Sequence, residues 1–330
     1  MVSWATGILT EAGIGPARAE AEQLAAYVAG VPRGRLALVA TLTAQQRDRF
    51  AALVERRARR EPLQHVLGSA AFRYLDLAVG PGVFVPRPET ELLAGWGVEQ
   101  AARLATERRR AAAADEEGDA GAEEGADAGA GAPEVLVVDL CSGSGAIALA
   151  MANEVPAARV VAVERAASAL DWLRRNAADR AAAGDRPIEV LAGDVTDPGL
   201  VADPARLGWA AGRVDVLLCN PPYVPDGTDV PPEVGDHDPA EAVFGGADGL
   251  VVIRAVIERA AELLRPGGVF GVEHDDTHGA AVPALLRADG RFVEVTGHRD
   301  LAGRPRFATA RRASRTDARG ADGTWQTGTS

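Results

Sequence analysis

A tetrapeptide in the second half of the chain, Asn220-Pro221-Pro222-Tyr223, combines residue types that can hold a planar –NH2 group. The Asn220 side-chain oxygen and the Pro221 carbonyl can accept its two protons, and the Tyr223 ring can cover its flat face. Because both prolines fix φ and lack an N–H donor, the carbonyls of this turn are held rigidly. Such a site would orient a nitrogen lone pair toward an electrophile. A plain turn with a packed tyrosine is the alternative interpretation.

A strand, a glycine-rich turn and the start of a helix are predicted from Val135 to Ala148. Gly143 and Gly145 allow the backbone to approach a ligand closely, and the helix start offers free N–H groups. Glu164 ends the next predicted strand, where an acidic side chain can accept both hydroxyls of a ribose. The pattern alone leaves two alternatives open. One is a tight turn without a ligand, and the other is an NAD or FAD site, because Gly143-x-Gly145-x-x-Ala148 also fits the dinucleotide fingerprint.

The elements around both motifs predict an α/β fold. Short apolar strands are expected at residues 135–140, 160–164, 188–191, 214–219 and 269–273, and helices at 146–153, 167–180 and 250–264. Apolar strands joined by helical crossovers are typical of a parallel sheet with both faces covered, and residues 292–295 and 306–310 would complete its edge. Because the tetrapeptide follows the fourth strand, we expect it to meet the glycine-rich turn at the carboxyl edge of the sheet, where open α/β folds bind ligands.

The part of the chain before the sheet predicts two smaller segments. Residues 1–70 predict a helical bundle, in which one helix ends at Gly30 and Thr43 caps the next. Residues 71–88 predict a hairpin linker, in which Phe72–Leu75 is an extended piece. A bundle of this size cannot bury much surface alone, so we expect it to pack against the next part of the chain.

The α/β domain is expected to span residues 89–312 and to begin with a helix from Thr90 to about Leu104. Residues 111–133 are acidic, of low complexity, and poor in large apolar side chains. Such a segment cannot offset the cost of ordering its backbone, so it predicts a disordered insert. Residues 313–330 predict a disordered tail for the same reason.

Composition narrows the classes of protein. The formal net charge of −12 argues against a protein that wraps nucleic acid through its general surface. The two cysteines, Cys141 and Cys219, lie inside motifs, so a reducing compartment is favoured over a disulfide framework. The sequence lacks a signal peptide pattern and an apolar run of ~18 residues, so a cytoplasmic protein without membrane association is expected. His274 and His278 have i, i+4 spacing without a metalloprotease motif, and no metal site is expected.

Two charged clusters each carry two interpretations. The arginines between Arg56 and Arg60 are either a solvated helix face or a contact for an RNA-bound partner. The segment Arg87-Pro88-Glu89-Thr90-Glu91 is either a wall of the ligand cleft or a turn that links the domains and starts a helix at Thr90.

The tetrapeptide and the glycine-rich turn together resemble the class I, Rossmann-like S-adenosylmethionine methyltransferases that act on amide or exocyclic amino nitrogens. Further stretches narrow the resemblance to the PrmC/HemK-type protein-(glutamine-N5) methyltransferases, which modify peptide chain release factors. These stretches are residues 61–68, 81–91, 237–250, 272–274 and 304–307. The similarity runs from about residue 10 to 312, apart from the acidic insert.

This resemblance implies a role for each motif residue. The residues implied to contact S-adenosylmethionine are Asp139, Cys141, Ser142, Gly143, Ser144, Gly145, Glu164, Asp194, Val195 and Asn220. The residues implied to bind the substrate are Asn220, Pro221, Pro222 and Tyr223, and of these Asn220, Pro221 and Tyr223 would be catalytic. Cys141 stands where many relatives have glycine, which is tolerable if the residue needs no positive φ. Val195 stands where some relatives carry an aromatic residue, which would weaken stacking on adenine.

The resemblance implies N5-methylation of a glutamine side chain, that of the Gly-Gly-Gln motif of release factors. We expect a monomer that binds no nucleic acid directly. An adenine-N6 or cytosine-N4 nucleic-acid methyltransferase would use the same tetrapeptide for the same reason. A nicotinamide dehydrogenase would use only the glycine-rich turn, and a non-catalytic interaction protein would use neither motif. No dedicated general base is evident in the sequence.

Overall fold

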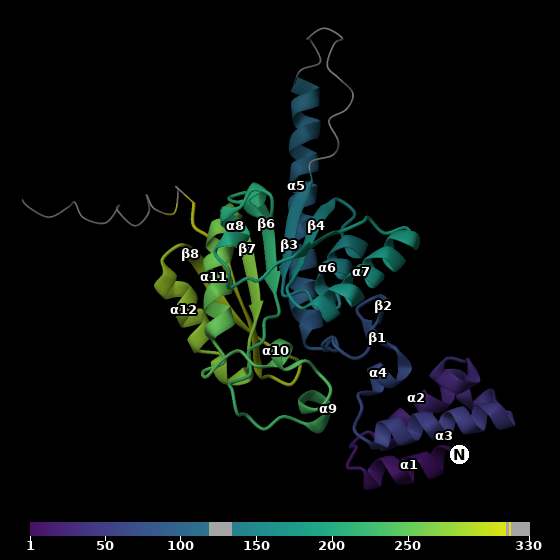
Figure 1. Cartoon of the computed structure of the whole chain (residues 1–330). Coiled ribbons are helices and arrows are strands. Elements are labelled where there is room, and N and C mark those ends of the chain that lie inside the picture. The colour runs from purple at the N-terminus through teal and green to yellow at the C-terminus, as the bar shows by residue number, and fades with distance from the viewer. Residues whose placement is uncertain (119–133, 315–316, 318–330) are drawn as a thin grey trace, which may run out of the picture.

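The computed structural model of the chain describes residues 1–118, 134–314 and 317. Figure 1 shows a group of helices at the N-terminus beside a larger part in which helices cover a sheet. A short hairpin joins the two along the chain.

The N-terminal part consists of α1 (Val2–Glu11), α2 (Ala17–Ala29), a 3-10 turn (Arg33–Leu38), α3 (Ala44–Ala58) and α4 (Leu63–Leu67). Apolar side chains from the facing sides of these helices, including Leu24, Phe50 and Val54, form its core. Thr43 caps α3 through a reciprocal pair of hydrogen bonds with Gln46, and Gly30 ends α2 with φ 69°. Both predicted helix boundaries are confirmed.

The hairpin consists of β1 (Ser69–Phe72) and β2 (Leu75–Ala78). Phe72 lies opposite Leu75, so the turn falls on the two residues between them and the predicted extended piece Phe72–Leu75 is wrong. Arg73 adopts φ 51° in this turn. Its Nη2 donates to Glu154 Oε2 at 2.6 Å and its Nη1 donates to the Glu91 carbonyl at 3.1 Å. Contacts from distant segments therefore hold the turn, and the local pattern of residues does not reveal them.

The central sheet has the strand order β5-β4-β3-β6-β7-β9-β8. Its strands are β3 (Val135–Leu140), β4 (Ala158–Glu164), β5 (Glu189–Ala192), β6 (Val214–Cys219), β7 (Leu264–Glu273), β8 (Phe292–Arg299) and β9 (Pro305–Arg312). The strands β5, β4, β3, β6 and β7 are parallel, and β9 runs antiparallel between β7 and β8. The predicted α/β class is confirmed, although β7 begins earlier, and β8 and β9 extend further, than the sequence pattern predicts.

Helices cover both faces of this sheet (Figure 1). One face carries α5 (Thr90–Gly118), α6 (Ala146–Glu154) and α7 (Ala167–Ala182). The other carries α8 (Gly199–Ala202), α11 (Val251–Leu263) and α12 (Ala281–Asp289). Two short helices, α9 (Pro232–Gly235) and α10 (Ala240–Val243), lie in the connection between β6 and α11.

Helix α5 is longer than predicted, since it continues from Thr90 to Gly118 instead of ending near Leu104. The expectation of disorder is therefore wrong for residues 111–118, while 119–133 lie outside the described residues. Low complexity did not stop the helix because alanine, which is abundant here, is the best helix former. Arg108 anchors this part of the helix to the sheet, with Nη2 2.5 Å from Asp215 Oδ1 on β6.

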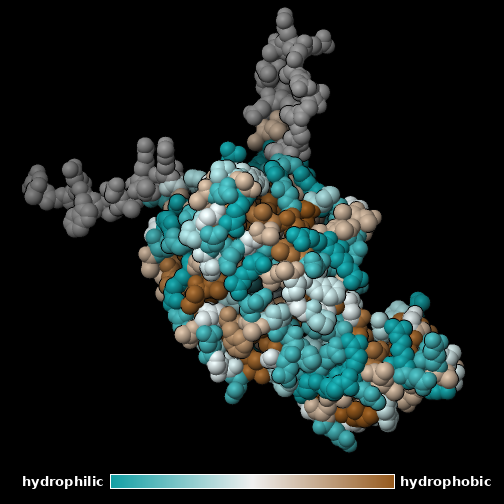
Figure 2. Space-filling model, in the orientation of Figure 1, coloured by the Kyte–Doolittle hydropathy of each residue, from teal (hydrophilic) through white to brown (hydrophobic). Residues whose placement is uncertain are grey.

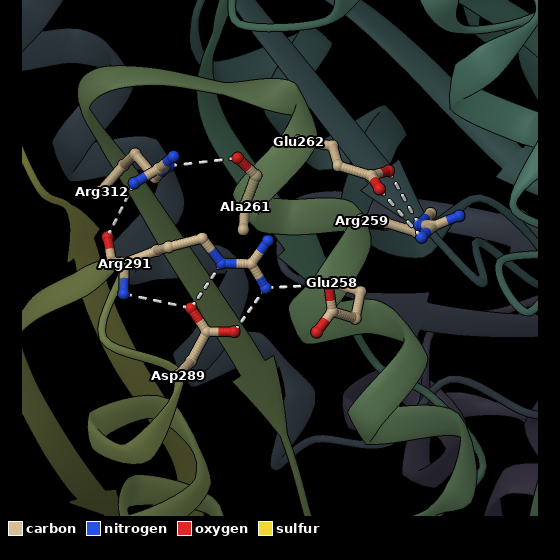
Figure 3. Close-up of polar contacts among 7 residues, drawn as sticks. All are labelled: Glu258, Arg259, Ala261, Glu262, Asp289, Arg291 and Arg312. Atoms are coloured by element: carbon tan, nitrogen blue, oxygen red, sulfur yellow. Dashed lines mark hydrogen bonds and ion pairs between the residues drawn. The ribbon is translucent and has the colours of Figure 1, made fainter.

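The antiparallel edge of the sheet is tied to α11 by arginines (Figure 3). Arg291 Nη2 lies 2.8 Å from Glu258 Oε2 of α11 and 2.5 Å from Asp289 Oδ2. Arg312 of β9 donates to the Ala261 carbonyl at 3.1 Å. These contacts link α11 and the end of α12 to β9 and to the residue that precedes β8.

The predicted disordered tail, residues 313–330, is described only at 313, 314 and 317. Asp317 accepts from Arg311 Nη2 at 2.9 Å and from the Ser314 backbone N–H at 2.7 Å. These three positions therefore continue the packing of β9, and the remainder of the tail lies outside the described residues.

Hydrophilic residues predominate on the face of the molecule drawn in Figure 2, and its apolar side chains gather in small separate groups. Within the described residues, no helix is both long enough and apolar enough to cross a membrane.

Candidate functional site

A cavity of about 300 Å³ opens at the carboxyl edge of the sheet, where both sequence motifs end. Its wall brings together the predicted residues Asp139, Cys141, Ser142, Gly143, Ser144, Glu164, Asp194, Val195, Asn220, Pro221, Pro222 and Tyr223. They come together because β3, β4, β5 and β6 are parallel and release their following loops at the same edge. A cavity with a mostly apolar wall and a few polar groups is typical of a small-molecule site.

Gly145 is the predicted cofactor residue that does not belong to this wall. It stands at the start of α6 with φ 90°, and a Cβ there would lie 2.6 Å from Leu173 Cδ1. The residue is therefore required for close packing of α6 on α7, and its predicted contact with the cofactor stays a prediction.

Cys141 adopts φ 58°, so the condition under which a cysteine would be tolerated here without strain is not met. A side chain in the left-handed region costs about 1–2 kcal/mol. The neighbouring hydrogen bonds impose the conformation, since Ser142 N–H donates to the Val163 carbonyl at 3.0 Å and the Ser142 hydroxyl donates to the Asp139 carbonyl at 2.9 Å. Strain of this kind persists where the surroundings over-determine the backbone, as around a ligand-binding turn.

Two carboxyl groups hold the glycine-rich turn in place. Asp139 is buried at the end of β3, and its Oδ2 accepts from the Ala148 N–H at 3.1 Å. Burial raises the pKa of Asp139 to about 7. Glu164 at the end of β4 accepts from the Gly143 N–H at 2.9 Å and from the Arg165 and Ala166 N–H groups, each at 2.8 Å. A carboxylate has about four acceptor positions, so a ligand that presents two hydroxyls here exchanges at least one of these bonds.

The loop after β5 forms the far side of the cavity. Asp194 Oδ1 accepts from the Thr196 N–H at 2.8 Å and from its hydroxyl at 2.7 Å. Asp194 Oδ2 lies 3.3 Å from Arg165 Nη1. Val195 packs its small side chain into the wall beside them. Sequence reasoning missed Arg165 and Thr196, which also line the cavity, because neither belongs to a recognisable motif.

The Asn220 side chain is oriented by a residue from a distant part of the chain. Its Nδ2 donates to the Thr90 hydroxyl at 3.1 Å, and Thr90 is buried at the start of α5. Because this bond uses the donor branch of the amide, the acceptor Oδ1 lies on the opposite branch. Both Asn220 and Thr90 line the cavity. Thr90 therefore holds the donor branch of the Asn220 amide, and the predicted role of Asn220 as an acceptor stays a prediction.

Tyr223 is fixed through its hydroxyl, which donates to Glu273 Oε1 at 3.0 Å. Glu273 ends β7 and is 1 % exposed. Burial raises the pKa of Glu273 to about 7, although the Thr90 and Tyr223 hydroxyls and the Arg306 guanidinium act in the opposite direction. Burial also raises the pKa of Tyr223. Glu273 therefore joins Thr90 and Tyr223 in one buried polar network behind the tetrapeptide.

The back of the tetrapeptide packs directly on glycine backbone. A Cβ at Gly245 would lie 2.5 Å from the Pro222 carbonyl oxygen, and a Cβ at Gly249 would lie 2.3 Å from the Tyr223 carbonyl oxygen. The Gly245 N–H donates to the Val224 carbonyl at 2.9 Å. No larger residue fits at either glycine without moving the tetrapeptide. Both glycines fall in residues 237–250, one of the stretches that carry the family resemblance, but the sequence alone assigned them no role.

The segment from Arg87 to Glu91 contributes to the wall of the cavity, because Arg87 and Thr90 both line it. It also links the domains, since α5 begins at Thr90. Arg87 Nη2 lies 2.6 Å from Asp238 Oδ2 and its guanidinium stacks 4.6 Å from the centre of the Phe84 ring. Both interpretations of this segment are therefore correct.

The histidine pair does not resemble a metal site. His274 Nδ1 lies 2.8 Å from the Asp275 carbonyl, and burial lowers the pKa of His274. In the part of the chain that the structure describes, His, Cys, Asp and Glu side chains form no group of three or more that could hold a metal ion.

The sheet order, the glycine-rich turn and the acidic end of β4 define a class I, S-adenosylmethionine-dependent methyltransferase. Comparisons with known families agree with this class. The model of the PrmC N-terminal domain matches residues 1–68, and the model of the methyltransferase small domain matches residues 130–235.

Curated relatives resemble the chain over nearly its full length. The release factor glutamine methyltransferase of Mycolicibacterium smegmatis is 44 % identical over 94 % of this chain and 96 % of the relative. That of Streptomyces coelicolor is 44 % identical over 94 % of this chain and 97 % of the relative. The 4-amino-L-phenylalanine/4-methylamino-L-phenylalanine methyltransferase of Streptomyces pristinaespiralis is 40 % identical over 88 % of each chain.

The chain therefore belongs to the release factor glutamine methyltransferases, a family of protein-(glutamine-N5) methyltransferases. The family, the class of enzyme and the cofactor predicted from the sequence are confirmed. The alternatives of a nicotinamide dehydrogenase and of a non-catalytic interaction protein are wrong.

Proposed function

We propose that this enzyme transfers a methyl group to the side-chain amide nitrogen of the glutamine in the Gly-Gly-Gln motif of peptide chain release factors. The observation that carries the proposal is the hydrogen bond from Asn220 Nδ2 to the Thr90 hydroxyl. Because it commits the donor side of the Asn220 amide to the protein, the acceptor side is left for an N–H group of the substrate.

The residues at the other end of the cavity fit S-adenosylmethionine by their chemistry. The backbone from Ser142 to Ser144 would hold the amino acid portion, Glu164 the ribose hydroxyls, and Asp194 with Val195 the adenine. Glu164 supports this fit because its carboxylate lies in the wall at the end of β4, where ribose hydroxyls would replace at least one of its three bonds to backbone N–H groups. The bound cofactor supplies a methyl group on a positively charged sulfur, which is a strong electrophile.

The protein's contribution to the reaction is to position and polarise the acceptor nitrogen. An amide nitrogen is a poor nucleophile because its lone pair is delocalised. Asn220 Oδ1 and the Pro221 carbonyl would accept hydrogen bonds from its two N–H groups and stabilise the positive charge that the nitrogen gains as the N–C bond forms. The Tyr223 ring would cover the flat face of the amide and exclude water. The methyl–sulfur bond breaks in the same step, and one amide proton then leaves to water.

The test is incubation of the purified enzyme with labelled S-adenosylmethionine and a purified release factor, followed by mapping of the labelled peptide. We expect label on the glutamine of Gly-Gly-Gln, and none when that glutamine is replaced by alanine. Label on another residue of the release factor, or no label on the release factor at all, would refute the proposal.

Two other acceptors belong in the same assay because they also present a planar –NH2 group. The relative named for 4-amino-L-phenylalanine is nearly as similar to this chain as the release factor enzymes are. An adenine-containing oligonucleotide tests the nucleic-acid alternative. We expect turnover of either to be negligible beside that of the release factor.

We further propose that the enzyme works as a monomer in the cytoplasm. The thiols of Cys141 and Cys219 support a reducing compartment, because both are free although they lie beside each other.

A further inference from the structure

Two residues of the arginine cluster at the end of α3, Arg57 and Arg60, form neither a solvated face nor a free basic patch. Arg57 is 5 % exposed, and its Nε lies 2.6 Å from Glu20 Oε2. Its Nη2 lies 2.9 Å from Glu233 Oε1, and Arg60 Nη2 lies 2.6 Å from Glu233 Oε2. One carboxylate from the catalytic domain thus binds two arginines of the N-terminal domain. We refer to Arg57, Arg60 and Glu233 as the clasp.

The clasp holds a segment that forms part of the cavity wall. Glu233 lies on α9, within the connection from the tetrapeptide to α11, and residues 225–243 of this connection are here called the strap. Val230 and Val234, on either side of Glu233, line the cavity. The carboxylate of Glu233 therefore anchors the strap to the N-terminal domain at the point where neighbouring side chains form the wall.

A second contact holds the strap nearby. Asp238 has a fully buried side chain, its Oδ2 lies 2.6 Å from Arg87 Nη2, and its N–H donates to the Val234 carbonyl at 3.1 Å. The strap is thus attached to the region before α5 at two points, Glu233 and Asp238. Of these, only the Glu233 contact reaches the N-terminal helices directly.

Arg60 is built into the N-terminal domain independently of Glu233. Its Nη1 donates to the carbonyls of Ala12 at 3.1 Å and Gly13 at 2.9 Å, and its backbone has φ 67°. Arg57 likewise keeps Glu20 as a partner. Loss of the Glu233 carboxylate would therefore leave each arginine with another partner. Loss of Arg57, in contrast, would leave the partly buried Glu20 carboxylate without an arginine to pair with.

We propose that Arg57 and Arg60 are positioning residues, which act through Glu233 to fix the strap as a wall of the methyl-acceptor site. The N-terminal domain then shapes the site as well as lying beside it. The statement that the strap is a wall of the methyl-acceptor site rests on the function proposed above. The statement that Arg57 and Arg60 fix the strap through Glu233 does not.

The test compares Glu233→Ala with Glu22→Ala. Glu22 is a matched control because it also binds two arginines, Arg18 at 3.1 Å and Arg33 at 2.8 Å, within the N-terminal domain alone. We expect Glu233→Ala to raise the KM for the release factor roughly tenfold, as loss of a partly buried ion pair does, with a smaller change in kcat. Glu22→Ala should leave both constants unchanged.

Hydrogen–deuterium exchange of the two full-length variants reports on the strap without any acceptor. We expect faster exchange of backbone amides within residues 225–243 in Glu233→Ala and wild-type exchange in Glu22→Ala. Arg60→Ala combined with Glu233→Ala should raise the KM for the release factor no further than Glu233→Ala alone, because the ion pair between Arg60 and Glu233 is already lost in Glu233→Ala. Glu233→Asp should restore part of the wild-type KM.

The outcomes separate this inference from the proposed function. If the wild-type enzyme does not methylate a release factor, the proposed function fails, and exchange alone decides whether Arg57 and Arg60 fix the strap through Glu233. If Glu233→Ala keeps wild-type exchange across the strap, the clasp does not position it and the inference is overturned. Additive effects of Arg60→Ala and Glu233→Ala on KM would overturn it as well.

Discussion

Replacing Thr90 with valine tests whether the network behind the tetrapeptide positions the acceptor oxygen of Asn220. Valine matches threonine in shape, so the buried site stays filled, but the hydroxyl that accepts from Asn220 Nδ2 at 3.1 Å is lost. A neutral hydrogen bond contributes about 1 kcal/mol to stability, so the variant should fold. The freed Asn220 amide can turn and present its own NH2 to the substrate NH2. Loss of one preorganised polar group costs roughly 3 kcal/mol in the transition state, or about a hundredfold in kcat.

The assay is labelled methyl transfer to a release factor, with the Kd for S-adenosylmethionine measured by calorimetry. We expect kcat to fall between about tenfold and a hundredfold in Thr90→Val, while the Kd for the cofactor stays near that of the wild type. Thr106→Val is the matched control, because Thr106 lies on the same helix and its hydroxyl bonds within that helix, donating to the Ala102 carbonyl at 2.9 Å and accepting from Arg109 Nη2 at 3.4 Å. A Thr90→Val enzyme whose kcat equals that of Thr106→Val would show that the hydroxyl does not position Asn220.

Three further predictions concern single side chains. Asn220→Ala should reduce kcat by about 10³-fold while the calorimetric Kd for S-adenosylmethionine rises only modestly, and near-normal turnover would contradict its assigned role. Cys141→Gly should relieve the left-handed strain at φ 58° and raise the free energy of unfolding by about 1 kcal/mol, measured by urea denaturation; an unchanged or lower value would count against strain there. Glu273→Gln should alter how stability depends on pH. Burial raises the pKa of Glu273 from 4.5 to about 7, so the folded state binds more protons than the unfolded state between these values, and this carboxyl makes the wild type less stable as pH rises through that window. The contribution is about 3 kcal/mol at most, and urea titrations at pH 5 and pH 8 should show a smaller loss in Glu273→Gln than in the wild type.

The sequence predicted the central sheet well because its inner strands are marked by continuous apolar runs. Residues 135–140 and 214–219 are strands with the predicted bounds. The parallel arrangement then required the glycine-rich turn and the tetrapeptide to lie at one edge, and they share one cavity. The site was predictable because topology alone brings these two motifs together.

The features that the sequence did not reveal depend on contacts between distant residues. Cys141 adopts a positive φ because the backbone of β4 and the end of β3 hold Ser142, and nothing in the local pattern indicates this. Thr90 and Glu273 support the tetrapeptide from α5 and β7, yet one resembles an ordinary helix start and the other an ordinary strand end. The arginines of α3 resembled a solvated run until the structure placed Glu233 beside them.

Recognition of the acceptor cannot come from the tetrapeptide alone. Two oxygen acceptors and an aromatic ring will hold any planar –NH2 group, whether it belongs to glutamine, to an aromatic amine or to adenine. Selectivity for the acceptor must therefore arise from parts of the cavity wall whose shape differs between enzymes with different acceptors, and from surfaces outside the cavity. In this enzyme the strap supplies such a part of the wall, and Glu233 binds it to the N-terminal helices. A large protein substrate that also contacts those helices would be selected by contacts that a free amino acid cannot make, and this is why the clasp variants should affect the KM for a release factor more than kcat.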